Sequence, residues 1–549
     1  WGTSAYGVAS HSEGFFTRAF ADYAHTEGQG TSAAGIAAHA EGVNTLARGV
    51  GSHAEGLWTS AHGAYAHAEG WFTVASGDYA HAQNFFTVAS GLGSHAEGNR
   101  SIARGQFSHA EGGFTIAGQE YAHAEGFQTS AFGIVSHAEG FYTQAYGPYS
   151  HSEGVATSAY GLASHAEGLA TRALGSYAHT EGQQTSATGT ASHAEGIQTL
   201  ALGAGSHAEG WGVSARGDYA HAEGLFTVAS GDYFHTQNFF TVASGLGSHA
   251  EGNRSIARGQ FSHAEGGFTI AGQEYAHAEG FQTSAFGIVS HAEGFYTQAY
   301  GPYSHSEGVA TSAYGTGSHA EGFATRAFGS WTHSEGLATS AFGTAGHAEG
   351  YITLALGEFA HAQNIGVSAL GTASHAEGFF TIASGDYSHA QGIQTVARGH
   401  ASHAEGLYTS AAEIGTHAEG LMTSAWGPFS HAEGAMNATE RGAFAAHAEG
   451  FDNRARGIAS HSEGYQTSAF GLGSHAEGRS TYALGQASHS EGWGTSALGI
   501  AAHAEGFFST ASGEYAHAEG WFTNARGFAS HTEGIQTSAY KQAAHAEGY

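Results

Sequence analysis

Histidine and glutamate recur together along the chain, two residues apart, in a motif that reads Ser/Ala-His-Ala-Glu-Gly. Residues 52–56 are one copy, and the motif returns every 14 residues. Of the 41 histidines, only His62 and His400 lie outside this series, which leaves 39 copies. Glutamine replaces the glutamate in four copies, at Gln83, Gln237, Gln363 and Gln391. Imidazole and carboxylate groups bind metal ions, transfer protons or form hydrogen-bonded pairs, so the repeat offers three kinds of chemistry.

Catalysis is the least expected of the three. An active site needs one place that differs from the rest of the chain, with a pocket and an oriented nucleophile. Here serine, histidine and glutamate occur in the same arrangement in repeat after repeat. We therefore expect the protein not to be an enzyme, and no catalytic residue is named.

Two interpretations of the motif remain. In the first, each imidazole donates to a glutamate of the same or a neighbouring chain, which forms a polar ladder that fixes chain register, because an unpaired buried member costs about 1–3 kcal/mol. In the second, the ladder binds a metal ion, since imidazole and carboxylate are ligands for zinc, copper and nickel. The candidate ligands are His53, Glu55, His67 and Glu69. No other cofactor is expected.

The two states of histidine predict opposite pH dependence. Histidines paired with glutamate have a raised pKa and stabilise the fold in acid, whereas histidines buried as neutral groups give the reverse trend. Protonation of every histidine changes the formal charge from −31 to +10, since −31 + 41 = +10.

The 14-residue repeat divides into two similar halves, such as 59–65 and 66–72. Each half alternates small and larger residues over five positions and then has two residues to turn a corner, which is typical of a β-strand. A glycine every seven residues would cost a helix about 1 kcal/mol each. We therefore predict an all-β fold: a parallel β-solenoid of about 39 coils of 14 residues, with two short strands per coil, in one continuous array over 1–549.

The residues expected to point into the coil are all small. We also expect the glycines among them to adopt backbone angles closed to other residues at the corners. In the coil at 59–72 the inward residues are Thr59, Ala61, Gly63, Ala66, Ala68 and Gly70.

A large apolar residue follows most His-Ala-Glu-Gly motifs, and it cannot fit inside such a coil. Left in water, these side chains would form a column of apolar surface well beyond the few hundred Å² that a soluble monomer exposes. We therefore predict that another chain covers them. The predicted interface comprises His11, Glu13, His39, Glu41, Phe15, Leu57, Trp71, Phe85, Phe127 and Trp211.

Two irregularities interrupt the array. Residues 83–161 recur unchanged as 237–315, so a block was duplicated without loss of register. The repeat at 435–450 is 16 residues long, and we expect its two additional residues to form a loop within 436–441.

Composition limits the partners. The formal charge is −31 with only 16 lysines and arginines, so nucleic acid is not an expected partner. There is no cysteine, which excludes disulfides and thiolate zinc sites. No apolar run is long enough to span a membrane.

The half-repeat Ser/Thr-x-Ala-x-Gly-x-x, doubled to 14 residues, resembles the head-domain repeat of trimeric autotransporter adhesins. Residues 157–161 and 164–168 show both halves, and the resemblance covers essentially the whole chain. It implies a left-handed parallel β-roll, three chains per unit and an extracellular, adhesive role. Similar repeats are also found in some phage tail fibres, so the motif specifies fold better than role.

The expected function is a structural and adhesive extracellular fibre at the cell surface, a homotrimeric rod whose open strand edges allow end-to-end filaments. A host or matrix surface is the expected partner, and Phe132, Tyr146 and Trp426 are candidate contacts. A phage tail fibre is the first alternative. A metal-binding or ice-binding module is the second, because Thr17, Thr31, Thr45 and Thr59 stack, although they are predicted to face inward.

Overall fold

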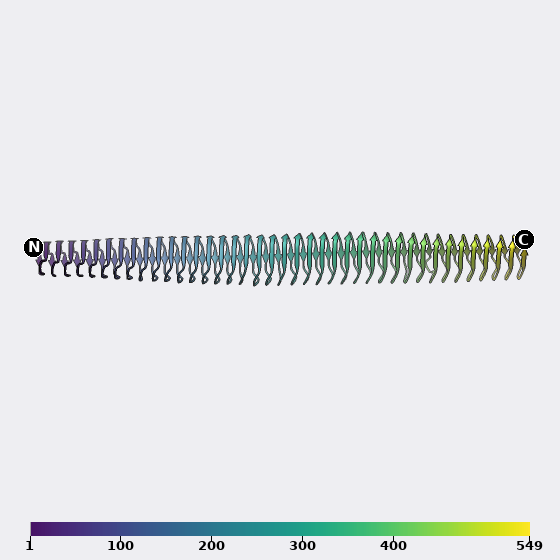
Figure 1. Cartoon of the computed structure of the whole chain (residues 1–549), viewed down its shortest axis with the longest axis horizontal. Coiled ribbons are helices and arrows are strands. Elements are labelled where there is room, and N and C mark those ends of the chain that lie inside the picture. The colour runs from purple at the N-terminus through teal and green to yellow at the C-terminus, as the bar shows by residue number, and fades with distance from the viewer. Residues whose placement is uncertain (1) are drawn as a thin grey trace. The chain divides into compact units, whose positions relative to one another are not determined.

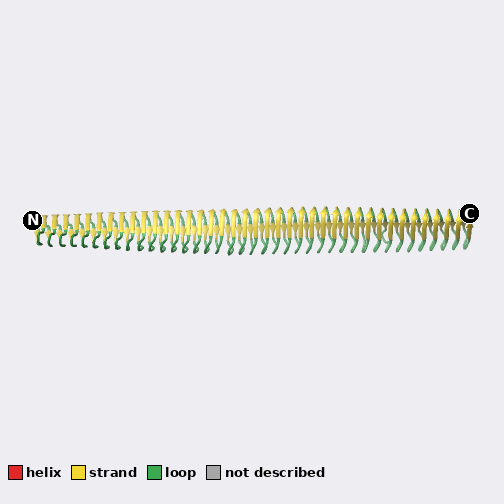
Figure 2. Cartoon of the chain, in the orientation of Figure 1, coloured by secondary structure: helices red, strands yellow, loops and turns green. Residues whose placement is uncertain are grey.

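The structure, a computed structural model, describes residues 2–549 as a succession of strands and turns (Figure 1). These residues form 78 strands, β1 (Ser4–Ala5) to β78 (His545–Gly548), and no helix (Figure 2). Contacts divide the chain into two compact units, Trp1–Tyr275 and Ala276–Tyr549. None of residues 2–549 belongs to a helix that could cross a membrane. The all-β prediction is confirmed.

Each coil contains one long and one short strand. In the coil at 59–72 these are β9 (Ser60–Ala61) and β10 (His67–Trp71). The long strand begins at the repeat histidine throughout, and two strands per coil were predicted. The first-half strand is shorter than the five alternating positions suggested. The reason is a tight turn directly after it, in which the Ala66 amide donates to the Gly63 carbonyl at 3.2 Å.

Within the first unit, equivalent strands of successive coils pair in parallel and in register. β8 (His53–Leu57) pairs with β10 so that His53 lies beside His67 and Glu55 beside Glu69. The long strands therefore form one sheet, here called the long-strand sheet, and the short strands form the short-strand sheet.

The second unit repeats this arrangement. β46 (His319–Phe323) pairs with β48 (His333–Leu337), with His319 beside His333 and Glu321 beside Glu335.

The small residues line the coil interior as predicted. Thr59, Ala61, Ala66 and Ala68 are at most 1% exposed. Gly63 is buried and Gly70 is half-buried.

The two glycines serve different purposes. A Cβ atom on Gly63 would lie 2.0 Å from the carbonyl oxygen of Gly77 in the next coil, so this site requires glycine for space. Gly70 has a φ of +116°, which L side chains rarely adopt. The positive φ that we expected for the glycines is therefore found at Gly70, in the second half of the coil, and not at Gly63.

One coil holds an aromatic ring in its interior. Phe234 stands where other coils have small residues, and it is 2% exposed. Its ring packs against Gly231, where an added Cβ would lie 2.1 Å from a ring carbon. The prediction is wrong for this coil, because a glycine without a side chain leaves room for a ring that points inward.

The corners are built by bulky residues in the left-handed region. Tyr65 and Phe72 both have φ of 56°. Such angles cost a non-glycine residue on the order of 1–3 kcal/mol. The rings they carry stack on the next coil, with centroid separations of 5.4 Å for Tyr65 and Tyr79 and 4.7 Å for Phe72 and Phe86. Stacking between coils thus offsets the backbone strain.

The 16-residue repeat at 435–450 joins the long strands β62 (His431–Ala435) and β64 (His447–Phe451), with the short strand β63 (Ala438–Thr439) between them. Its additional turn is at Arg441 and Gly442, after which the buried Ala443 occupies the position of the usual glycine. A loop was predicted within 436–441, and Gly442 extends it by one residue.

Candidate functional site on the long-strand sheet

The long strand presents histidine and glutamate on one face because side chains alternate along a strand. Ala54, between His53 and Glu55, is fully buried on the opposite face. In-register pairing then aligns equivalent residues of successive coils. The result is a histidine column and a parallel glutamate column, here called the two columns.

The imidazoles of the histidine column stack almost face to face. Ring centroids are 4.7 Å apart between His39 and His53, and the rings are inclined by 11°. The side chain of His53 is 32% exposed, and that of Glu55 is 48% exposed. Stacking therefore shields the imidazoles more than the carboxylates.

Each imidazole lies against the glutamate of its own coil. The Nε2–Oε2 distance is 3.3 Å between His53 and Glu55 and 3.4 Å between His39 and Glu41, and both pairs are hydrogen bonded. In the first coil His11 and Glu13 are 3.6 Å apart and more exposed.

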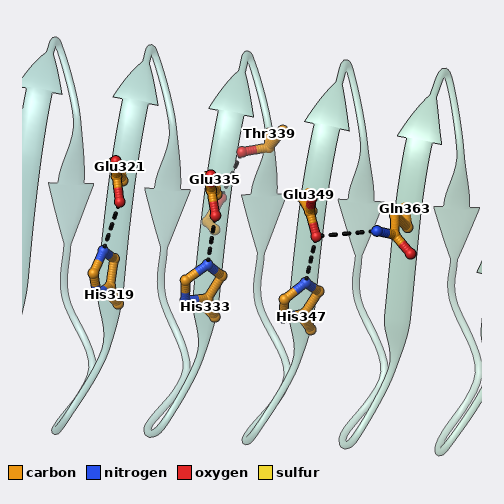
Figure 3. A network of polar contacts seen from close by, with 9 residues as sticks. His319, Glu321, His333, Glu335, Thr339, His347, Glu349 and Gln363 are labelled. Carbon is orange, nitrogen blue, oxygen red and sulfur yellow. Dashed lines mark hydrogen bonds and ion pairs between the residues drawn. The ribbon is translucent and has the colours of Figure 1, made fainter.

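The same pairs recur in the second unit, where Figure 3 shows three successive coils. His319 and Glu321 are 3.4 Å apart, and His333 and Glu335 are 3.3 Å apart. The predicted polar ladder therefore exists within one chain.

Glutamine links neighbouring coils where it replaces glutamate. The Gln363 amide donates to Glu349 Oε2 at 3.2 Å, across one coil step (Figure 3). Gln83 donates to Glu69 at 3.1 Å in the same way. By supplying a donor, these glutamines relieve the repulsion between stacked carboxylates.

Burial and mutual proximity lower the pKa of many column histidines. For His95 the largest cause is burial, followed by the neighbouring imidazoles His81 and His109, while Glu97 acts in the opposite direction. Burial likewise lowers the pKa of His165, ahead of its two imidazole neighbours. These side chains are therefore neutral at neutral pH, and burial outweighs pairing with glutamate.

The four candidate metal ligands lie in adjoining coils, but each imidazole already contacts the carboxylate of its own coil. His53 is bonded to Glu55, and His67 Nε2 lies 3.5 Å from Glu69 Oε2. Among residues 2–549, three ligand atoms lie within 4.8 Å of one another in two other groups. These are His461, Glu463 and His475, and His503, Glu505 and His517. Sequence reasoning missed them because their motifs match all the others.

Most of the apolar residues of the predicted interface are exposed in the single chain. The exposed fractions are 55% for Trp71, 51% for Trp211 and 44% for Phe15. Leu57 is half-buried. Phe85 and Phe127 are 38% and 39% exposed. These residues end the long strands, so they form a column beside the two columns on the long-strand sheet.

The candidate contact residues lie next to the short strands. Phe132 and Tyr146 stack at 5.1 Å, and Tyr146 stacks on Tyr160 at 4.8 Å. Trp426 lies beneath the guanidinium of Arg441, 5.1 Å from its ring centroid. In the second unit a stack of five rings continues this pattern: Phe286, Tyr300, Tyr314, Phe328 and Phe342.

The threonine column faces inward as predicted. Thr17, Thr31, Thr45 and Thr59 are at most 1% exposed. An ice-binding array needs its threonines at the surface, and these are not. Val213 and Val367 occupy the same buried position in two coils, so the position does not require a hydroxyl.

No protein-family model matches the chain, and no curated protein matches it. The role of the columns is therefore argued from their geometry.

Proposed function

We propose that this protein is a structural, adhesive extracellular fibre that assembles as a homotrimer through its long-strand sheets. The observation that carries the proposal is the column of exposed apolar side chains that ends the long strands, with Trp71 and Trp211 each more than half exposed. The coil interior offers these side chains no place, since alanine, glycine and threonine fill it.

Burial of this column between chains removes apolar surface from water, at about 25 cal/mol per Å². Repeat proteins in which each coil contacts only its neighbours gain stability from interfaces in this way. We propose three chains because the resemblance to adhesin head repeats implies a trimer. The two columns adjoin the apolar column on the same sheet, so assembly also brings the histidines and glutamates of different chains together.

The short-strand sheet remains outward in this arrangement and carries the adhesive surface. Its stacked aromatic residues, such as Tyr300 and Tyr314, lie at a centroid separation of 5.0 Å. We propose that this stripe contacts a host or matrix surface. A phage tail fibre would use the same trimer and the same stripe, and binding to bacterial envelope material in place of animal matrix would identify that alternative.

Substitution of the apolar column tests the proposal. The double variant Trp71→Ser and Phe85→Ser removes two adjacent exposed rings, whereas Tyr146→Ser removes one ring beside a short strand. Light scattering coupled to size exclusion is expected to give three chain masses for the parent and for Tyr146→Ser, and weakened association for the double variant. Equal masses for all three proteins at every concentration would contradict the role of the apolar column.

A further inference from the structure

The contact between histidine and glutamate opens toward the C-terminal end of the second unit. At His431 the imidazole is still hydrogen bonded to Glu433, with Nε2 and Oε2 3.3 Å apart. From His461 onward the same distance is 3.5–4.0 Å in every coil. The rings also tilt, by 38° between His475 and His489. Comparable distances occur in scattered coils elsewhere, such as 3.9 Å at His179 and 3.7 Å at His221, but the C-terminal coils differ in that seven of them follow in succession.

The imidazole nitrogens in this region are shielded from solvent and unpaired. Within residues 2–549, Nε2 has no hydrogen-bond partner at seven successive column histidines, from His447 to His531. Elsewhere such atoms occur singly or in pairs of coils. A buried polar atom without a partner costs free energy, and a bound cation is one way to satisfy it.

Two groups in this region bring two imidazoles and one carboxylate together, and we propose that they bind divalent transition-metal ions, with zinc as the reference ion. The first is His461, Glu463 and His475, and the second is His503, Glu505 and His517, each with its ligand atoms within 4.8 Å. Zinc–nitrogen bonds are about 2.0–2.1 Å long, so opposite ligands of one ion lie at most about 4.2 Å apart. Small side-chain rotations would bring the ligand atoms of each group to the separation that one zinc ion requires.

The types of ligand atom decide which ions these two groups suit. Two nitrogen ligands and one carboxylate favour zinc, copper or nickel over magnesium or calcium, which prefer oxygen ligands.

Zinc titration of the full chain after dialysis against a chelator tests this assignment. We expect saturable binding of two ions per chain, with no competition from magnesium. The double variant His475→Gln and His517→Gln is expected to weaken binding about tenfold or more, since changes even in the groups around a metal site cost 10–100-fold. The matched control is His305→Gln with His333→Gln, whose imidazoles are hydrogen bonded to Glu307 and Glu335. This control should bind zinc like the parent.

A second measurement on the unmodified chain does not depend on how the variants fold. Copper bound at these groups should show nitrogen hyperfine coupling from imidazole in its electron paramagnetic resonance spectrum. The assignment is overturned if zinc binds the C-terminal variant as well as the parent, if the control loses binding equally, or if bound copper shows no nitrogen ligand.

Discussion

The imidazole of His53 lies flat over that of His67, with ring centroids 4.8 Å apart and an inclination of 5°. Protonation of both rings would place two positive charges at this distance. Where the pKa of a column histidine is shifted, as at His95, His123 and His165, it is lowered, with burial as the first cause.

Acid should therefore destabilise the fold. A histidine whose folded pKa lies below its unfolded value of 6.5 gives its full stabilisation above pH 6.5 and loses it as the pH falls through the folded value. We expect the midpoint temperature of unfolding to be lower at pH 5 than at pH 8. A higher midpoint at pH 5 would mean that pairing with Glu97 and its equivalents governs the pKa.

Gly63 should not tolerate a larger residue. In Gly63→Ala the new Cβ would meet the Gly77 carbonyl oxygen at 2.0 Å, so the two coils must separate. We expect a loss of about 1–3 kcal/mol, the usual cost of overpacking, measured by chemical denaturation. Ala64→Ser, at the adjacent half-exposed position, is the control and should change stability little. Equal stability of Gly63→Ala and the parent would refute the close approach.

Phe234 should destabilise its own coil. Because neighbouring coils fit serine or alanine at this position, Phe234→Ala restores the regular interior and should raise the midpoint of unfolding. Val367→Ala removes volume from a position that β-branched residues fill, and should cost about 1–3 kcal/mol. If Phe234→Ala instead loses several kcal/mol, the ring fills space that the fold requires.

Two asparagines form a buried ladder next to the inserted turn. The Asn453 amide nitrogen donates to Asn437 Oδ1 at 2.8 Å, and Asn453 Oδ1 accepts from the Thr467 amide at 2.7 Å. Asn453→Ala leaves the backbone amide of Thr467 without its acceptor. We expect a loss of about 1–3 kcal/mol in stability and faster amide hydrogen exchange at Thr467. The exposed Gln466→Ala should leave that exchange rate unchanged, and the same acceleration in both variants would contradict a role for the ladder.

The repeat alone predicted the coil, its parallel stacking and the inward small residues, because a 14-residue period and its alternation depend only on residue types. It predicted two short strands per coil but not that the first-half strand spans only 2 residues, which depends on the turn between Gly63 and Ala66. It also did not distinguish His461 from His53, because the two motifs offer the same imidazole and carboxylate. The opening of the C-terminal contacts could not be predicted either, because the motif has the same histidine and glutamate there as elsewhere.

Phe234 was missed for a related reason. Its position was assigned to small residues from the other coils, and only the adjacent Gly231 provides space for the ring. Irregular residues in a regular array are therefore where sequence reasoning is weakest.

The mass of the particle at nanomolar concentration tests the central claim most directly, because the proposed assembly buries large apolar side chains such as Trp71 and Trp211 between chains. Single-particle mass measurement of the purified full chain should give three chain masses, with no folded single chain present. A stable, folded particle of one chain mass at that dilution would contradict the account.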